Sequence, residues 1–415
     1  MYYPNLEDIK NAARRLSHII NETPLTYNFN VSKEHQADVW LKREDLQTVR
    51  SYKIRGAYNK MSQLTTKELE RGIVCVSAGN HAQGVAYSCQ YLKVKGTIFM
   101  PNTTPKQKIE QVKMFGCEYV SIILKGDSFD DAKEEALSFC NQNNAVFIHP
   151  FDDEKIIEGQ GTIALEILNQ KKDKIDYLFL PVGGGGIAAG VSAVFKKLSP
   201  NTQIIGVEPQ GAASMTISIQ NNKNTTLQFI DKFVDGAAVS RVGDLNFNIC
   251  KNTLDDIITV PEGKVCETIL KLYNKDAIVV EPAGALTLAA LDFYANKIKG
   301  KNVVCVVSGS NNDITRTEEI KERALLYAGL KHYFIVRFPQ RAGALKQFVV
   351  EVLSPTDDIT HFEYTKKNSR STGQAIVGIE LSNANDLERL VTKMKALNFF
   401  EQYLNEMPHL LSVLV

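Results

Sequence analysis

The chain has 415 residues, enough to bury a large hydrophobic core and to form two or three domains. Hydrophobic residues make up 44% and charged residues 23%, as in an ordinary globular protein. Because 48 Lys and Arg balance 47 Asp and Glu, the net charge is only +1. This balance gives no electrostatic reason to expect a nucleic acid or a membrane surface as partner.

The cysteines and the N-terminus indicate a cytoplasmic protein. Seven cysteines are scattered without a C-x-x-C pair, which predicts neither a disulfide framework nor a zinc site. The first residues lack the basic and apolar regions of a signal peptide. The uncharged stretch 177–195 approaches the length of a membrane span, but Pro181 and the run of four glycines at 183–186 interrupt it. We therefore expect a strand, a tight loop and a helix there.

From residue 71 onward, short apolar runs alternate with helical patterns. The first half predicts strands at 73–76, 97–100, 119–123 and 145–148, with helices at 80–92, 106–115 and 128–140. Pro105 precedes the second helix, where its missing N–H costs nothing. The second half predicts further strands at 177–180, 204–207, 257–260 and 303–307. These continuous apolar runs are typical of parallel sheets covered on both faces, so we expect an α/β region of two open sheets.

The pattern changes near residue 327. A strand is expected at 332–338, a helix from the turn at 339–345 to about 353, strands at 359–365 and 375–381, and a helix at 385–397. Residues near Leu410 are expected to close this order as an α+β ferredoxin-like unit. Its length of about 85 residues is enough for one small domain.

Lys53 lies in the run Ser-Tyr-Lys-Ile-Arg-Gly-Ala at 51–57. Positive neighbours, including Arg50, Arg55 and Lys60, together with partial burial favour a neutral amine. Only a neutral amine attacks an aldehyde to form an imine. The alternative is an ordinary surface lysine, but the flanking residues favour a reactive amine.

A second run, Ser-Ala-Gly-Asn-His at 77–81, follows a predicted strand and begins a helix. Backbone N–H groups at such a turn bind carboxylates, so Ser77, Ala78 and Gly79 are candidates for substrate binding. Asn80 belongs to the same turn, and its side chain can also hydrogen-bond to a phenolic oxygen. The alternative is an ordinary helix N-cap. We interpret His81 as a packed or hydrogen-bonded histidine.

A glycine loop follows the predicted strand at 177–182 and precedes a helix that begins near Ile187. Its members are Gly183, Gly184, Gly185 and Gly186. Glycines let the backbone approach a phosphate closely, and the helix N-terminus adds favourable charge. A purely structural role is disfavoured, because each glycine weakens packing and raises the cost of ordering the loop.

The same loop supports a rival function, that of an NAD-dependent dehydrogenase. Gly184, Gly186 and Ala189 match the dinucleotide-binding spacing, and Glu208 ends the next strand, where a ribose ligand would lie. A single match of this kind is weak. A dehydrogenase would also leave the runs around Lys53 and Asn80 unexplained.

Ser308 ends the predicted strand at 303–307. Its hydroxyl is suited to a hydrogen bond with a pyridine nitrogen. A hydroxyl cannot keep that nitrogen protonated as an aspartate would. A pyridine ring bound beside Ser308 would therefore be a weaker electron sink than one bound beside an aspartate. We therefore expect elimination with prompt departure of a β-leaving group.

Together, the runs at 51–57 and 77–84, the four glycines and the Ser308-Gly309 pair resemble the fold-type II pyridoxal-phosphate enzymes. Within these enzymes the chain is similar to the biosynthetic threonine dehydratases over nearly its whole length. The resemblance implies two open twisted sheets, like those of the tryptophan synthase β chain, in a catalytic domain at 1–328. A smaller subdomain at about 50–150 would be inserted in it, with a regulatory domain at 329–415.

The resemblance also implies roles for the site residues. Lys53 would carry pyridoxal 5'-phosphate and take the Cα proton, and Asn80 would contact the ring oxygen. Gly183 to Ile187 would hold the phosphate, and Ser308 the pyridine nitrogen. L-Threonine would lose water to give 2-oxobutanoate and ammonia, the first step of isoleucine biosynthesis, and L-serine would be a second substrate.

Two positions separate the chain from related serine racemases. Those relatives have a second serine as the base on the opposite face, where this chain has Ala78, and this argues against racemisation. They also bind a divalent metal through acidic residues. Here Glu208 is present but Ser214 stands in place of an aspartate, so no metal site is expected.

The C-terminal region resembles the single ACT-like domain of the shorter biosynthetic enzymes, through the run at 338–345. This implies inhibition by isoleucine and relief by valine. We expect a homo-oligomer, with a homotetramer as the prediction and a dimer as the alternative. A domain that only builds the oligomer is the alternative interpretation. A catabolic serine or threonine dehydratase is a further alternative for the whole chain, although such enzymes usually lack this tail.

Overall fold

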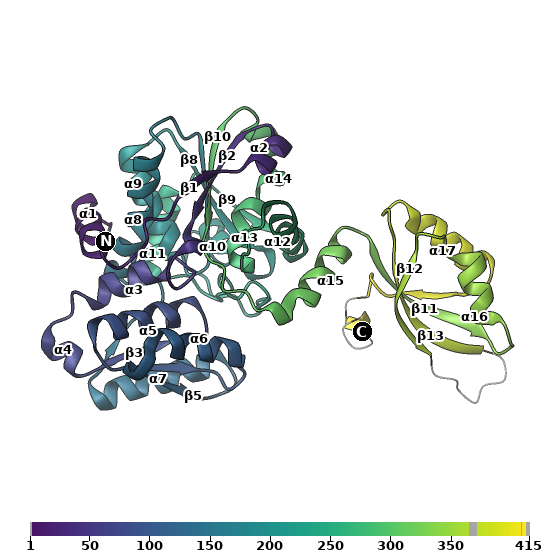
Figure 1. The fold of residues 1–415 in the computed structure, drawn as a ribbon, viewed down its shortest axis with the longest axis horizontal. Helices are drawn as coiled ribbons and strands as arrows, with labels where there is room; N and C mark the ends of the chain where they lie inside the picture. The colour runs from purple at the N-terminus through teal and green to yellow at the C-terminus, as the bar shows by residue number, and fades with distance from the viewer. Residues whose placement is uncertain (1, 365–371, 408, 412–415) are drawn as a thin grey trace. The chain divides into compact units, whose positions relative to one another are not determined.

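The computed structural model describes residues 2–364, 372–407 and 409–411. The chain forms two compact units, Met1–Thr315 and Arg316–Val415. Figure 1 shows the helices and strands of both units.

The larger sheet of the first unit has six strands in the order β1-β2-β10-β7-β8-β9. All neighbouring strands run parallel except β1, which pairs antiparallel with β2. The strands are β1 (Leu25–Tyr27), β2 (Asp38–Arg43), β7 (Tyr177–Pro181), β8 (Gln203–Pro209), β9 (Asp256–Val260) and β10 (Asn302–Val307). The four strands expected in the second half of the sequence all lie in this sheet.

A smaller parallel sheet has the order β5-β4-β3-β6. Its strands are β3 (Ile73–Val76), β4 (Gly96–Met100), β5 (Val120–Leu124) and β6 (Val146–Phe147). Figure 1 shows this sheet in blue, below the larger one. The sequence patterns located these strands to within about two residues, so the prediction of two open sheets is confirmed.

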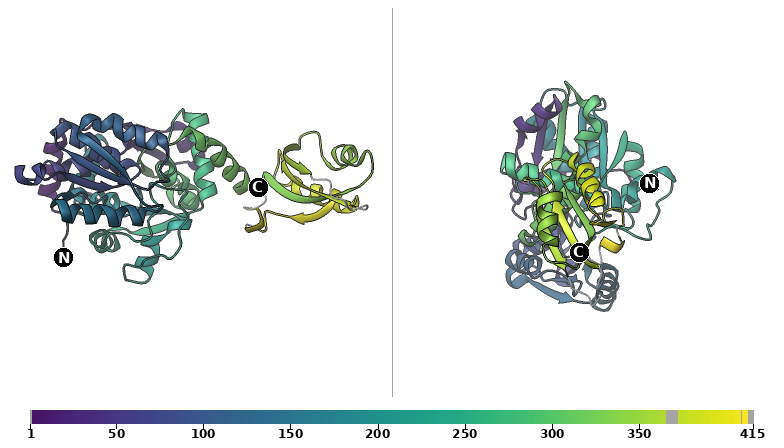
Figure 2. Two further views of the ribbon diagram at one scale, coloured as in Figure 1. Left: turned by 90° about the horizontal axis from the view of Figure 1, so that it is seen from below. Right: turned by 90° about the vertical axis from the view of Figure 1, so that its right-hand side faces the viewer.

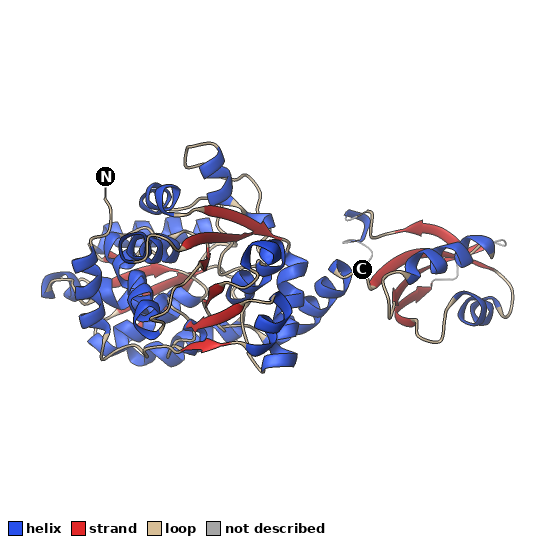
Figure 3. Cartoon of the chain, turned by 90° about the horizontal axis from the view of Figure 1, so that it is seen from above, coloured by secondary structure: helices blue, strands red, loops and turns tan. Residues whose placement is uncertain are grey.

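Helices lie on both faces of the strands in residues 1–315, as Figure 2 and Figure 3 show. The first seven are α1 (Leu6–Leu16), α2 (Phe29–His35), α3 (Lys53–Met61), α4 (Thr66–Glu70), α5 (Asn80–Leu92), α6 (Lys106–Gly116) and α7 (Phe129–Asn143). The next seven are α8 (Glu154–Gln170), α9 (Gly186–Leu198), α10 (Ser214–Gln220), α11 (Asp244–Thr253), α12 (Glu262–Asp276), α13 (Pro282–Ala289) and α14 (Leu291–Ile298). Short 3₁₀ turns are η1 (Glu44–Leu46), η2 (Cys117–Tyr119), η3 (Gln210–Ala212) and η4 (Ile314–Arg316).

Burial on both faces explains why the strands read as unbroken apolar runs. Every residue of β3 is buried, as are Val303 to Val307 in β10. The central helices α8 and α9 are buried along most of their length, and they form one core with the larger sheet. The uncharged stretch 177–195 is therefore β7, the glycine loop and most of α9. No helix in the described part of the chain is long and apolar enough to cross a membrane.

The second unit has the order βαββαβ after a first helix, and its sheet order is β12-β13-β11-β14 with antiparallel pairs. Its elements are α15 (Thr317–Tyr327), β11 (Lys331–Pro339), α16 (Ala344–Gln347), the π-helix η5 (Phe348–Val352), β12 (Asp358–Tyr364), β13 (Thr372–Glu380), α17 (Asp386–Ala396) and β14 (Phe400–Tyr403). This is the ferredoxin-like topology that the sequence predicts.

Two details of the second unit differ from the expectation. The closing strand is β14, not the residues near Leu410, because Phe399 anchors that strand in the core while Leu410 donates a helical-turn hydrogen bond to Met407. The expected helix to residue 353 is only briefly an α-helix and continues as a π-helix. The expected strand end at residue 365 lies outside the described residues.

Candidate functional site

Lys53 is the first residue of α3, which follows β2 and the short turn η1. The segment just before it is fixed to the end of β10. Ser51 pairs with Gly309 in an isolated bridge, and the N–H of Tyr52 donates to the carbonyl of Ser308 at 3.2 Å. The two predicted residues Lys53 and Ser308 are therefore neighbours in space, although 255 positions separate them in the sequence.

The Lys53 amine is half-buried and donates a hydrogen bond to the carbonyl oxygen of Pro150, at 2.8 Å. Burial lowers the pKa of this amine to about 8, against the opposing negative charge of Glu281. The amine is thus neutral much more often than that of an exposed lysine, as a nucleophilic role requires.

The turn at 77–80 joins β3 to α5 at the carboxyl end of the smaller sheet. The Ser77 hydroxyl accepts a hydrogen bond from the N–H of Gly79, at 3.1 Å, which shapes the turn. A Cβ atom placed on Gly79 would meet nothing within 4 Å. Open space therefore lies in front of this turn, at the N-terminus of a helix of 13 residues. This geometry suits a small carboxylate.

Asn80 begins α5, and both ends of its side-chain amide are occupied. Its nitrogen donates to a carboxylate oxygen of Glu281 at 2.7 Å. Its oxygen accepts from the side-chain nitrogen of Asn311, also at 2.7 Å. Asn80 lies on the smaller sheet's helix, whereas Glu281 and Asn311 come from the larger part of the unit, so these bonds join the two sides of the site.

The glycine loop lies between β7 and α9. Gly185 has a φ of +90°, a conformation that favours glycine. The backbone N–H groups of Gly183 to Ile187 donate no hydrogen bond to any of the described residues. The loop thus offers a set of unpaired donors at a helix N-terminus, which is an anion-binding arrangement.

Packing is a second reason for the four glycines, beside the binding of an anion. A Cβ on Gly184 would lie 2.2 Å from the ring of Phe151, and one on Gly186 would lie 3.0 Å from the Phe151 carbonyl. A Cβ on Gly183 would meet the backbone of Ala237 at 2.8 Å. The glycines therefore let the chain pack tightly behind the loop.

The sheet topology explains why these segments converge. In the larger sheet β10 lies between β2 and β7, and all three strands run parallel. Their carboxyl ends therefore share one edge, which carries η1 and α3, Ser308 and the glycine loop. The turn at 77–80 reaches the same place from the smaller sheet through Asn80.

Two histidines lie beside the site but have structural partners. His81 is buried, and its Nε2 donates to the carbonyl of Ile148 at 2.9 Å. Burial, aided by the charge of Lys53, lowers the pKa of His81 to about 3, so this ring is neutral. His149 accepts hydrogen bonds from the N–H groups of Phe151 and Asp152. The interpretation of His81 as a packed, hydrogen-bonded residue agrees with this geometry.

Sequence reasoning missed three residues of the site: Glu281, Phe151 and Asn246. The sequence predicts an exposed acidic residue at Glu281, before Pro282, but only 4% of Glu281 is exposed. Asn246 is fully buried, and its side-chain nitrogen donates to the carbonyls of Phe151 and Gly184. The only available signal was Glu281 at a helix N-cap, a position usually filled by a smaller polar residue.

Glu208 has partners that exclude the role expected of it in a dehydrogenase. The side chain is fully buried, and its carboxylate accepts from the N–H groups of Met215 and Thr216 and from the Thr216 hydroxyl, at 2.7–2.8 Å. Burial raises the pKa of this carboxyl to about 7. Glu208 therefore holds the N-terminal turn of α10 and is not turned toward a ribose.

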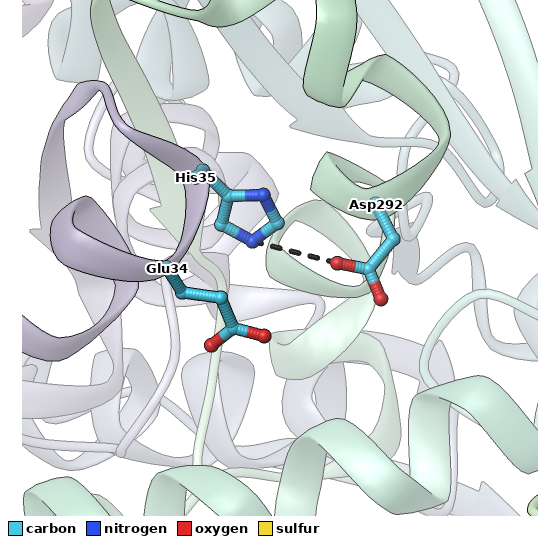
Figure 4. A group of neighbouring side chains, drawn as sticks. All are labelled: Glu34, His35 and Asp292. Carbon is cyan, nitrogen blue, oxygen red and sulfur yellow. Dashed lines mark ion pairs between the residues drawn. The ribbon is translucent and has the colours of Figure 1, made fainter.

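One group of side chains in the described chain has the spacing of a metal site. Glu34, His35 and Asp292 lie close together on α2 and α14, as Figure 4 shows. Each carboxylate already has a lysine partner: Lys271 pairs with Glu34, and Lys264 with Asp292. Because these positive charges oppose a cation, we interpret the group as an ion-pair network.

The class of the protein follows from this site and from a comparison with protein families. Residues 16–309 match the model for pyridoxal-phosphate dependent enzymes. A half-buried amine with a lowered pKa, a loop of unpaired amides and a turn at a helix N-terminus are what that cofactor needs. Residues 322–410 match a second model, the C-terminal regulatory domain of threonine dehydratase.

Individual relatives define the family within this class. The chain is 54% identical to the L-threonine dehydratase biosynthetic IlvA of Halalkalibacterium halodurans, over 99% of both chains. It is 53% identical to the protein of that name from Bacillus subtilis, over 99% of this chain and 97% of that one. The chain belongs to the family of biosynthetic threonine dehydratases.

Solved structures agree with this family. The processed threonine deaminase isoform 2 of Solanum lycopersicum matches with a TM-score of 0.73 and 39% identity, over 78% of this chain and 90% of that one. The threonine deaminase of T.th. matches with a TM-score of 0.71 and 34% identity, over 75% of this chain and 99% of that one. The fold-type II architecture and the pyridoxal-phosphate cofactor inferred from the sequence are confirmed.

Proposed function

We propose that this chain uses pyridoxal 5'-phosphate to convert L-threonine to 2-oxobutanoate and ammonia, as the first step of isoleucine biosynthesis. The observation that carries the proposal is that the Lys53 amine, the glycine loop and the turn at 77–80 converge. All three lie at the carboxyl ends of the parallel strands of the two sheets. When bound, the cofactor supplies an electron sink for the negative charge that develops at the substrate Cα.

Each residue of the site has a physical role in this proposal. Lys53, with a pKa of about 8, binds the cofactor and then moves the Cα proton. The N–H groups of Gly183 to Ile187 bind the phosphate. Ser308 lies buried at the end of β10. Its hydroxyl would hold the pyridine nitrogen of the cofactor.

The turn at 77–80 binds the substrate. Its N–H groups orient the carboxylate of threonine at the positive end of α5. Ala78 carries no proton-transferring group, so this turn supplies no second base for racemisation. This absence favours elimination of the β-hydroxyl over inversion at Cα.

The test is release of 2-oxobutanoate from L-threonine by the cofactor-loaded protein. Lys53→Ala should reduce the rate by roughly 10⁴-fold, the upper range for losing a positioned proton-transfer group. Lys60→Ala is the matched control, because Lys60 lies on the same helix and pairs with Asp153 at 2.8 Å. It should change the rate less than about twofold. Equal rates for the two variants would refute the role of Lys53.

We also propose that residues 1–328 are catalytic and that residues 329–415 bind isoleucine as inhibitor and valine as opposing effector. Support comes from the ferredoxin-like order of the second unit and from the regulatory-domain match at 322–410. A homotetramer and a cytoplasmic location are part of this proposal. The latter is supported by seven free cysteines.

Inhibition separates this role from that of a catabolic dehydratase acting on serine or threonine. A biosynthetic enzyme should lose activity when isoleucine is added and regain part of it when valine follows. Deleting residues 329–415 should remove the inhibition while threonine is still converted. Inhibition that survives the deletion would place the effector site elsewhere.

A further inference from the structure

The side-chain amide of Asn80 is held in one orientation by two neighbours, a hydrogen-bond donor on one side and an acceptor on the other. Asn311 donates through its side-chain nitrogen to Oδ1 of Asn80, and the same nitrogen donates to the carbonyl of Val49 at 2.9 Å. Nδ2 of Asn80 donates to Oε1 of Glu281. The three side chains form a directional chain of donors that ends on a buried carboxylate.

Glu281 is built into this position. It is the N-cap residue of α13, yet its side chain makes no capping bond to its own helix. Its backbone N–H donates to the carbonyl of Gly309 at 3.1 Å. A Cβ on Gly309 would lie 2.6 Å from Oε1, and one on Gly236 would lie 3.3 Å from it. Glycines on two sides thus leave room for the carboxylate against Asn80.

The side-chain amide of Asn311 also has one favoured orientation. Its Oδ1 is buried without a hydrogen-bond partner in the described chain. The opposite orientation would place that oxygen against the Val49 carbonyl and Oδ1 of Asn80, and both of these atoms only accept. The chain therefore keeps a buried unpaired oxygen so that the Asn311 nitrogen can face Asn80.

An asparagine amide is nearly symmetric in shape, so packing alone does not decide which way its oxygen points. A carboxylate only accepts and an NH₂ group only donates. Glu281 and Asn311 therefore select the orientation with the Asn80 nitrogen toward Glu281. One N–H of that nitrogen is used by Glu281, and the second is left for a ligand.

We propose that Glu281 and Asn311 are positioning residues that fix the Asn80 amide so that its second N–H donates to the phenolic oxygen of the cofactor. This inference rests on the proposed pyridoxal-phosphate function. A reversed amide would place its oxygen against another oxygen, which weakens cofactor binding.

Several charged groups surround this chain of donors. Burial and, to a smaller extent, the Asp235 carboxylate raise the pKa of Glu281 to about 7. This value already includes the opposite, lowering effects of the hydrogen bond from Asn80 and of Lys108, the ion-pair partner of Asp235. Lys53 faces Glu281 from α3. The variants are therefore compared at one pH, above that of Glu281 ionisation.

The test is a pair of isosteric substitutions in the full chain, read by the dissociation constant of pyridoxal phosphate from the apo-protein. Asn311→Asp replaces the donor facing Asn80 with an acceptor and should weaken binding about tenfold. The double variant Asn311→Asp with Glu281→Gln offers Asn80 a complete but reversed set of partners. Its melting temperature should therefore return toward that of the parent, while its affinity stays low.

Asn80→Ala gives the reference for a lost contact. In that background Asn311→Asp should change the affinity less than about twofold, since no amide remains to orient. If affinity and melting temperature recover together in the double variant, the two residues are structural only and the inference is wrong. An unchanged affinity in Asn311→Asp would also overturn it. Absence of pyridoxal-phosphate binding by the parent protein would instead refute the proposed function.

Discussion

The two units of the chain bury different kinds of residue. Beneath the site of residues 1–315, the guanidinium of Arg55 is fully buried between the carboxylates of Glu44 and Glu166, and Lys42 pairs with Glu166. The core of residues 316–415 is apolar, with packed aromatic rings such as Phe338, Phe348 and Phe399. The first unit thus carries buried charge around α3, whereas the second unit is stabilised mainly by apolar packing.

The difference shows that the position of α3 in the first unit is fixed more precisely than apolar packing alone would fix it. Arg55 lies two residues after Lys53 on α3 and makes hydrogen bonds to Glu44 at 2.7 and 2.8 Å and to Glu166 at 2.6 and 2.9 Å. Such bonds have directions, so they fix the rotation and height of the helix. Apolar contacts fix a volume and tolerate small displacements.

The largest expected effect comes from breaking the buried charge network. Arg55→Met leaves two carboxylates with one lysine, so the free energy of unfolding of the first unit should fall by about 3–5 kcal/mol. Arg337→Met is the control, because Arg337 and Glu401 form a pair at the surface of the second unit. It should cost less than about 1 kcal/mol. Chemical denaturation measures both, and similar losses would contradict the contrast between the units.

A cavity in the second unit should separate regulation from catalysis. Phe348 is fully buried, and Phe348→Ala should destabilise residues 316–415 by about 3–5 kcal/mol. We expect the response to isoleucine to disappear while the release of 2-oxobutanoate without effector is retained. Calorimetry and the keto-acid assay measure the two effects. Full inhibition by isoleucine in a destabilised variant would oppose the assignment of the effector site.

Two glycines of the site should differ in what an added methyl group does. Gly184→Ala places a Cβ on the Phe151 ring, so it should cost about 1–3 kcal/mol of stability and weaken cofactor binding. Gly79→Ala enters open space at a φ of −139° and should change stability by less than about 1 kcal/mol. Instead it should raise the KM for threonine, because the methyl group occupies the proposed carboxylate position. An unchanged KM would argue against that binding site.

The smallest effect concerns pH. Because the Lys53 amine has a pKa of about 8 rather than 10.5, its neutral fraction rises with pH and reaches half at about 8. The rate at which the apo-protein captures pyridoxal phosphate should therefore rise with pH and level off above that value. Stopped-flow absorbance measures the rate. A midpoint near 10.5 would mean that the surroundings do not perturb the amine.

Much of the fold was predictable, because buried parallel strands leave unbroken apolar runs. β3 and β10 are such runs, and both were located from the sequence. By contrast, β1 and β2 were not predicted. β2 alternates buried and exposed positions at its start, and its partner β10 lies about 260 residues later in the chain. Pairing over that distance leaves no local signal.

The site was predictable where a backbone shape demands particular residues, and it was not where long-range contact sets the role. Four successive glycines and a turn before a helix are local patterns, so the residues from Gly183 to Gly186 and from Ser77 to Asn80 could be found. Glu281 could not, since its hydrogen bond to Asn80 joins residues that are 201 positions apart. The packing of Phe151 against Gly184 and Gly186 is likewise visible only in the three-dimensional structure.

Reduction of the cofactor-loaded protein with borohydride, followed by peptide mass spectrometry, tests the central claim most directly. Reduction makes the bond between an amine and the cofactor permanent, so the modified lysine can be identified. The structure predicts the modification on the peptide that contains Lys53 and its absence in Lys53→Ala. Modification of a different lysine in the native protein, or of none, would contradict the site described.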